Sequence, residues 1–446
     1  MEIESPLTFR VSHERYQRGA DIPRIWRVKI PEVQARKTQM GLLRLAGCTG
    51  ESVPSRLWPE IAEIARATLT LTLTALVGSV PAYSEPSPSS SECLAGAVLA
   101  DASETAPPTN GGSRNSRLAN VLGLGYGVQY WGTGYTAEDL AAAPHGLLII
   151  EATKLGATDS WSGREELFSS EEVRQIRRDG ARPTLGYINL SEIETYRDYW
   201  VATVTSRTTK AATGDVDGLP SWVGPQVGTN EWLAIYWAPE WEAILMARLE
   251  RLLALGLDGV FLDDALHYYN YASGEGLEGR SAAHRDDTPE GAPGFARAMM
   301  GLVERLAARA RALRCDSIVI VNNGVFIGRD AGPESSETAG AAAFERYRSA
   351  IDGILMESML SPVPQDAVIE VLHEDFASHG VPVLTLDFLS HALSSVPSDE
   401  VRNMVVARAA EAGFLPYVAD DEAFDRLYPP IRAPIEQLPR PVKSRQ

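Results

Sequence analysis

Four acidic residues of this sequence each end a short, largely apolar run: Glu151, Asp263, Glu357 and Asp387. A strand that packs on helices needs apolar side chains on its outer face, and apolar residues immediately precede all four acids. The alternation of side chains along a strand therefore predicts that the four acids point to the opposite, inner face. Two carboxylates on either side of a glycosidic bond can hydrolyse it, because one protonates the leaving oxygen and the other acts as nucleophile or base.

Asp263 and Glu357 are the predicted catalytic pair. Their strands are the fifth and the seventh in the predicted order, so they stand about 10 Å apart along a barrel wall, two strand spacings of about 4.8 Å. Side chains that converge inward shorten this gap towards the roughly 5–5.5 Å of an enzyme that retains the configuration of the sugar. The sequence leaves open whether the configuration is retained or inverted.

Aromatic residues are predicted to line the same site. By the same alternation Trp131, Tyr187 and Tyr236 can face inward. Sugars present apolar faces that stack on aromatic rings, so these three residues are assigned to substrate binding. Each of them alone is equally suited to a hydrophobic core.

Polar residues complete the predicted substrate site. Arg197 follows Glu192 and Glu194 at short spacings, and we expect it to pair with one of them at the rim of the site. A plain surface ion pair is the alternative. The alternative for two of the other polar residues, Glu151 and Asp387, is a simple pairing with Arg or Tyr. Besides Glu192 and Arg197, the polar residues assigned to substrate binding are Glu151, Asp264, Asn322 and Asp387.

The strands that carry these residues alternate with helical stretches such as 241–255 and 294–313. Eight parallel strands with this rhythm predict a (β/α)8 TIM barrel, in which ligands bind at the end where the strands stop. A long loop is predicted at 201–230. A ninth apolar run, Phe414–Val418, is either an appended strand or a sign that one of the eight is wrong. The eight predicted strands are 127–131, 146–152, 183–190, 232–237, 258–263, 317–323, 353–357 and 382–387.

The composition is that of a globular protein with a large acidic excess. Of its 446 residues, 44% are hydrophobic and 22% are charged, and the formal net charge is −18. Phosphate binding needs clustered Lys and Arg, so this charge argues against nucleic acid as a partner. A negative field concentrates cationic ligands instead, although acidity that only maintains solubility would give the same number. The oligomeric state is left open.

No metal centre is predicted. The three cysteines, Cys48, Cys93 and Cys315, form no ligand pattern, and the seven histidines form no HExxH motif or cluster. Cys93 and Cys315 could pair after export, but nothing in their spacing demands it.

The N-terminal part is predicted to lie outside the barrel. Residues 1–84 form a leader with a predicted signal peptide at 57–84, because an apolar run follows a basic residue and precedes small ones. This run is shorter than the about 20 residues that span a membrane, so no stable membrane span is expected; a β-strand is the alternative for its alternating Leu and Thr. About 55 residues precede the signal, more than a signal peptide allows, so we hypothesise that translation starts downstream of Met1.

A flexible linker (85–117), the catalytic barrel (118–430) and a C-terminal tail (431–446) follow. The predicted location is secreted, cell-envelope or periplasmic.

Several segments together resemble the endo-α-1,4-polygalactosaminidase family, glycoside hydrolase family 114. They are YINLSEIETYRDYW from Tyr187, IYWAPEW from Ile235 and GLDGVFLDD from Gly256, with YGVQY, VNNG, MES and VLTLDF in the expected order. The resemblance spans roughly residues 120–420 and looks closest to the prokaryotic branch of extracellular, signal-bearing barrel proteins.

The resemblance implies a barrel enzyme that hydrolyses α-1,4-linked galactosamine or N-acetylgalactosamine polysaccharide without a cofactor. It implies Asp263 as the nucleophile and Glu357 as the acid/base. This sequence departs from the family pattern at Glu151, where aspartate is usual, and at Asp264, where asparagine is frequent. These departures bear on the exact sugar more than on the fold.

Two other functions fit the same residues. A non-catalytic carbohydrate-binding or envelope barrel would keep the aromatic residues but would not need paired acids, so the acids favour catalysis. A metal-dependent hydrolase would use Asp263, Asp264 and Asn322 as oxygen ligands. Activity that survives a chelator would exclude the second.

Overall fold

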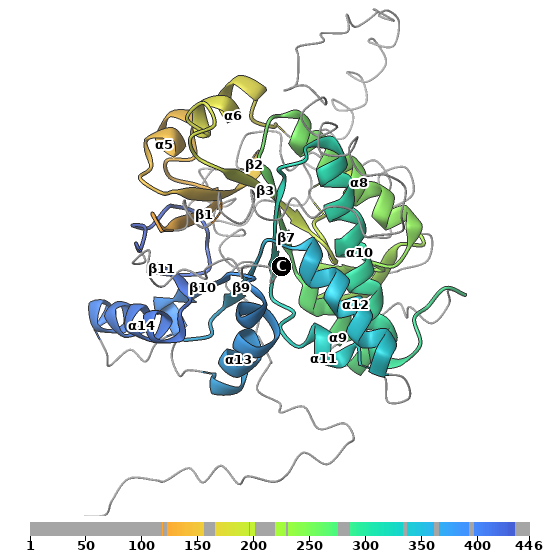
Figure 1. Ribbon diagram of the computed structural model, residues 1–446. Coiled ribbons are helices and arrows are strands. Elements are labelled where there is room, and N and C mark those ends of the chain that lie inside the picture. Colours follow the sequence, from red (N-terminus) through yellow and green to blue (C-terminus); the bar gives the residue numbers. More distant parts are fainter. Residues whose placement is uncertain are drawn as a thin grey trace, which may run out of the picture. The chain divides into compact units, whose positions relative to one another are not determined.

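The structure is a computed structural model, and its described part begins close to where the barrel is predicted to begin (Figure 1). The predicted signal peptide, the linker and residues 433–446 of the predicted tail lie outside the described residues, so these assignments stay predictions. The structure describes residues 118, 123–155, 166–195, 197–200, 219–228, 231–274, 286–332, 337–360, 365–391 and 397–432.

Eight parallel strands form a nearly closed barrel, which confirms the predicted (β/α)8 fold. Consecutive strands of the sheet pair in parallel from the first to the last. The last strand comes back beside the first, because Tyr126 packs on Tyr417 with ring centroids 5.4 Å apart. In order around the sheet, the strands are β1 (Tyr126–Trp131), β2 (Leu147–Leu155), β3 (Thr184–Asn189), β7 (Gly259–Asp263), β8 (Ile318–Asn322), β9 (Gly353–Glu357), β10 (Val383–Phe388) and β11 (Leu415–Ala419).

The predicted strand 232–237 is wrong as a barrel strand. Its first part forms β6 (Glu231–Ala234), which pairs antiparallel with β4 (Glu192–Ile193) and β5 (Val223–Gly228) in a separate three-stranded sheet. The run is apolar because it is buried in the layer outside the barrel, so composition alone did not distinguish it from a barrel strand. The ninth apolar run therefore supplies the eighth strand, β11, and the loop predicted at 201–230 contains β5.

Helices surround the strands in Figure 1. The predicted helices at 241–255 and 294–313 are found as α8 (Pro239–Ala254) and α10 (Gly291–Leu313). Pro at the start of α8 suits a first turn, whose N–H groups need no partner within the helix. The other helices of the described part are α5 (Ala137–Ala142), α6 (Ser170–Ile176), α9 (Tyr268–Ser273), α11 (Ile327–Asp330), α12 (Glu337–Ala350), α13 (Asp366–Val371) and α14 (Ser398–Ala412), with short 3-10 or π segments at Ala265–His267, Leu372–Phe376, Ala377–His379 and Leu389–His391.

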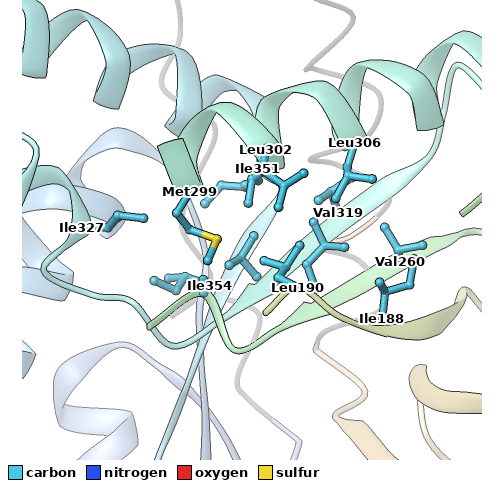
Figure 2. Packing of buried hydrophobic residues seen from close by; sticks show 14 of the residues in the cluster. Ile188, Leu190, Val260, Met299, Leu302, Leu306, Val319, Ile327, Ile351 and Ile354 are labelled. Atoms are coloured by element: carbon cyan, nitrogen blue, oxygen red, sulfur yellow. The ribbon is translucent and has the colours of Figure 1, made fainter. Parts of the chain in front are cut away.

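Two apolar layers flank the barrel wall. An outer layer joins the strands to the helices, and in it Met299, Leu302 and Leu306 of α10 meet strand residues such as Val319 and Ile354 (Figure 2). An inner layer fills the barrel with residues from all eight strands, as a TIM barrel requires. Its members include Leu147, Ile149, Leu185, Phe261, Ile320, Leu355, Leu384, Leu386 and Tyr417.

Two further features of the described part bear on the predictions. None of its helices is both long and apolar enough to cross a membrane. Cys315 is disulfide-bonded, and its partner is not among the described residues. The pairing with Cys93 that the sequence allows is therefore not tested.

Candidate active site

Asp263 and Glu357 converge on one side chain at the barrel mouth. Asn322, at the end of the strand between theirs, donates from its Nδ2 atom to Asp263 Oδ1 at 2.6 Å and to Glu357 Oε1 at 2.7 Å. Because the two oxygens share this one nitrogen, they lie no more than about 5.3 Å apart, the sum of the two distances. Phe261 and Leu355 belong to the inner layer, so Asp263 and Glu357, two residues further on, face inward as predicted.

The chain turns sharply just after each of these three residues. Asp264, Asn323 and Ser358 have φ angles of 59°, 60° and 52°, in the left-handed region that residues other than glycine rarely adopt. Asp and Asn tolerate it best, since their short polar side chains bond to nearby backbone. Such conformations cluster at functional sites. Here each left-handed residue directly follows the site residue that ends its strand.

The two carboxyl groups share a confined place that disfavours charge. Burial, followed by the charge of Asp264, raises the pKa of Asp263 to about 8. Burial, followed by the charge of Asp263, raises the pKa of Glu357 to about 8. The pair therefore holds a proton near neutral pH.

The two carboxyl groups differ in their hydrogen bonds. Asp263 accepts from Asn322, from the Asp264 backbone N–H at 2.8 Å and from the side chain of Tyr187. The Glu357 carboxyl accepts from Asn322. Since hydrogen bonds to a carboxylate favour the ionised form, this arrangement favours the charge on Asp263 and the shared proton on Glu357.

A second polar group flanks Asp263. Asn189, at the end of β3, donates from Nδ2 to Asp264 Oδ2 at 2.5 Å, and the side chains of Glu192 and Asp264 are hydrogen-bonded. Burial raises the pKa of Asp264 to about 6. His267 lies next to them. One nitrogen of His267 and one carboxylate oxygen each of Glu192 and Asp264 lie within 4.8 Å of one another. The predicted residues Glu192 and Asp264 thus lie beside the catalytic pair.

Asn322 is oriented as a hydrogen-bond donor to the two acids. Its amide nitrogen, not its oxygen, points at Asp263 and Glu357. In this orientation it offers no ligand to a hard cation, because the ligands of such a cation are oxygens.

Aromatic side chains lie beside these polar residues at the mouth of the barrel. Tyr187 lies in the inner layer, as predicted, and its ring centroid is 4.7 Å from that of Tyr130. Tyr130 in turn contacts Phe424 at 4.8 Å, and Phe424 contacts Phe388 at 5.8 Å. These four rings form a continuous wall, which we call the aromatic wall.

The inward orientation predicted for Trp131 is wrong. Trp131 is 42% exposed, and its Nε1 atom donates to the Ala423 carbonyl at 2.8 Å. Tyr126 and Val128 of β1 belong to the inner layer and Tyr130 packs against it, so the alternation of this strand places Tyr130 inward and Trp131 outward. Trp131 stays near the mouth, since Ala423 neighbours Phe424 of the aromatic wall.

Tyr236 and Asp387 also differ from the prediction. Tyr236 is fully buried in the outer layer, where its hydroxyl donates to the Phe295 carbonyl at 2.9 Å, because its segment is not a barrel strand. In β10 the inner layer contains Leu384 and Leu386, so Asp387 faces the other way and its Oδ1 accepts from the Leu360 N–H at 2.8 Å. An apolar residue fits both faces of this wall, and the alternation was assigned to the wrong one.

Arg197 belongs to a buried ion network rather than to the open mouth. Its guanidinium pairs with Glu151 and, at 2.9 Å, with Glu194. Of the two acids expected to pair with Arg197, Glu194 thus forms an ion pair with it. Arg248 reaches Glu151 from α8 at 3.3 Å. Burial works to raise the pKa of Glu151, but the charges of Arg197 and Arg248 outweigh it and the pKa is lowered.

Replacing Arg197 by methionine is expected to destabilise the fold strongly. The side chain is 0% exposed, and its loss leaves Glu151 short of a buried partner. Removing one member of a buried ion pair typically costs about 3–5 kcal/mol. Urea unfolding measures this change, with Arg174→Met as the control, because Arg174 forms its ion pairs at the surface. Equal unfolding midpoints for the two variants would contradict the structural role of Arg197.

Sequence reasoning missed several residues of the mouth. Asn189 ends β3 as Asn322 ends β8, so the rule that found Asn322 could have found it. Tyr130 was missed because the alternation of β1 was assigned to the wrong face. His267 and His391 stand in short helices behind strand ends, where alternation gives no information.

Comparisons with known proteins agree with this architecture. Residues 159–432 match the family model described as glycoside-hydrolase family GH114. A protein of Deinococcus radiodurans described as uncharacterized is 25% identical over 309 residues, which cover 67% of this chain and 82% of that protein. Another from Thermotoga maritima, also described as uncharacterized, is 27% identical over 207 residues, which cover 46% of this chain and 54% of that protein.

Two solved structures are similar at low sequence identity. The glycoside hydrolase domain of PelA from Pseudomonas aeruginosa is 17% identical with a TM-score of 0.42, covering 69% of this chain and 98% of that chain. Ega3 of Aspergillus fumigatus, in complex with galactosamine, is 13% identical with a TM-score of 0.45, covering 69% of this chain and 95% of that chain. The family match extends over more than half of the 446 residues and includes both carboxylates of the pair. This chain therefore belongs to glycoside-hydrolase family GH114.

Proposed function

We propose that this glycosidase cleaves α-1,4-linked galactosamine-type polysaccharide, with Asp263 as nucleophile and Glu357 as acid/base. The observation that carries the assignment is the convergence of both carboxylates on Asn322, which limits the gap between them. Enzymes that invert the configuration need about 6.5–9.5 Å to fit a water between the carboxyl groups, whereas those that retain it use about 5–5.5 Å. The proposed reaction therefore retains the configuration.

In the first step Glu357 gives its proton to the glycosidic oxygen while Asp263 attacks the anomeric carbon. The bond to the leaving sugar breaks, and a covalent glycosyl-Asp263 ester forms. In the second step Glu357, now a carboxylate, takes a proton from water, which displaces Asp263 and releases the sugar. Tyr187 and the Asp264 N–H stabilise the Asp263 carboxylate before attack, and they stabilise it again when the second step regenerates it.

Charge supports a substrate that carries amino groups. Asp264 and Glu192 stand beside the nucleophile, and the chain carries a net charge of −18. A polymer with unacetylated galactosamine is cationic, so a negative field at the mouth would attract it. The aromatic wall offers rings for the apolar faces of the sugars.

Purified protein incubated with galactosamine and N-acetylgalactosamine polymers tests the proposal. We expect shortened products from the polymer with free amino groups, and the anomeric configuration of the new reducing ends, read by NMR at early times, to match that of the substrate. Binding to either polymer without shortening would favour the non-catalytic barrel. Early products of the opposite configuration would overturn the retaining mechanism.

A further inference from the structure

Three polar side chains form a row of contacts beside the acid/base. Ser358 is the residue after Glu357, and its Oγ lies 3.0 Å from Nδ1 of His391. On the other side of the ring, Nε2 of His391 lies 2.5 Å from Oε1 of Glu422. The three residues follow β9, β10 and β11, so the row crosses the tops of three neighbouring strands on the Glu357 side of the mouth.

The backbone of Ser358 is fixed in the orientation that this row needs. Its N–H donates to the Leu386 carbonyl at 2.8 Å, and its own carbonyl accepts from Gln365 Nε2 at 3.1 Å. The left-handed φ of 52° turns the chain at this point. The His391 ring packs on Phe388 of the aromatic wall, with centroids 5.3 Å apart. Ser358 and His391 are thus both held against the barrel.

The groups that act on the charge of His391 are nearly all acidic. The hydrogen bond to Glu422 raises the pKa of His391, and the charges of Glu422, Asp387 and Glu357 raise it further, while burial opposes them. A protonated ring can donate from both nitrogens at once, to Ser358 Oγ and to Glu422 Oε1.

Glu422 also acts on Glu357, whose ionisation is difficult. Burial and the charges of Asp263, Asp264 and Glu422 all raise the pKa of Glu357, and Asn322 opposes them by hydrogen bonding. Glu357 must nevertheless become a carboxylate when it gives up its proton. A positive charge nearby would stabilise that carboxylate and would offset the charge of Glu422.

We propose that His391, held as an imidazolium between Ser358 and Glu422, stabilises the carboxylate that forms on Glu357 during proton transfer to the leaving oxygen. This inference rests on the proposed function, in which Glu357 is the acid/base. The proton that moves is that of Glu357, and it ends on the leaving oxygen as the glycosidic bond breaks. His391 keeps its own proton and acts through Glu357, so it is a positioning residue rather than a catalytic one.

Variants that remove charges along the row should change the pH–rate profile in a characteristic way. His391→Gln leaves the charge of Glu422 uncompensated, so the pKa of the alkaline limb of the profile should rise by about one unit while kcat falls. Adding Glu422→Gln to this variant removes the uncompensated charge, so the limb should return towards its wild-type position while kcat stays low. A merely structural role for His391 would lower kcat without moving the limb. His379→Gln is the matched control, since His379 is exposed and precedes β10, at the other end of the barrel.

A titration without substrate tests the same coupling directly. Carbon-13 NMR of the Glu357 carboxyl should show a higher pKa in His391→Gln than in the wild type, and the double variant should reverse this rise. The His391 ring should titrate above its ordinary value of about 6.5 in the wild type. A Glu357 pKa that is equal in all three proteins, or a His391 ring that is neutral at the working pH, would overturn the inference. Failure of the proposed function looks different, because Glu357→Gln would then retain activity whatever His391 does.

Discussion

Replacing Asp263 by asparagine is expected to abolish turnover while the fold stays intact. The amide cannot attack the anomeric carbon, and removal of one member of a cooperating catalytic set costs at least about 10³-fold in kcat. Its carbonyl oxygen can still accept from Asn322 and from the Asp264 N–H, so the local hydrogen bonds survive. Kinetics on the galactosamine polymer and thermal unfolding measure the two effects.

The stability of this variant decides between chemistry and structure. Burial and the charge of Asp264 disfavour a charged Asp263, so the neutral amide should leave the melting temperature unchanged or raise it. Asp330→Asn is a suitable control, because Asp330 is also partly buried but accepts from Tyr268, away from the pair. Near-wild-type turnover of Asp263→Asn would end the assignment of the nucleophile. If the loss of activity were explained by a lower melting temperature alone, the role of Asp263 would be structural.

The sequence predicted the inner face of Asp263 and Glu357 because both positions obey one strong constraint. Val260, Leu262, Ile354 and Met356 must contact helices, which leaves the alternate positions for the barrel interior. The same rule misplaced Asp387, since the interior of this barrel is itself apolar and Leu384 and Leu386 fit it equally well. Alternation gives two faces but does not say which one is inside.

Other differences have causes beyond any local pattern. Tyr236 lies in an apolar run that is buried in a second sheet, so its composition matched a strand of the wrong kind. Trp131 was placed inward because the alternation of β1 was assigned to the wrong face, whereas Tyr126, Val128 and Tyr130 share the inner side. The order of β7, β8 and β9 was predicted, but the convergence of Asn322 on both carboxylates depends on side-chain orientations that no sequence pattern gives.

The contacts of His391 show a third kind of limit. Ser358, His391 and Glu422 are far apart in the sequence and follow three different strands, so no spacing connects them. Parallel pairing of β9, β10 and β11 brings these strand ends together at the mouth. Contacts of this kind are found from the structure, and variants that change the charge of one residue test their effect on the others.

Replacing Glu357 by glutamine is expected to remove the alkaline limb of the pH profile together with most of the activity. General acid catalysis contributes about 10²–10⁴-fold, so kcat on the polymer should fall by that factor. Burial and Asp263 raise the pKa of Glu357 to about 8, so the acid form is present below pH 8 and is lost as the pH rises through it. The limb of the wild-type enzyme should therefore lie near pH 8. A limb that persists in Glu357→Gln would belong to another group.

The leaving group distinguishes the acid from the other roles in this site. An aryl glycoside of a galactosamine oligomer with an acidic phenol needs little protonation, so Glu357→Gln should form its glycosyl-enzyme at close to the wild-type rate and then stall, because no base activates water. Added azide needs no base, and it should release a glycosyl azide of retained configuration. Asp263→Gly should give the azide of inverted configuration instead, since azide then replaces the nucleophile itself. Opposite stereochemistry in the two variants requires that the two carboxylates act on opposite faces of one sugar ring, which their shared contact with Asn322 allows at this separation.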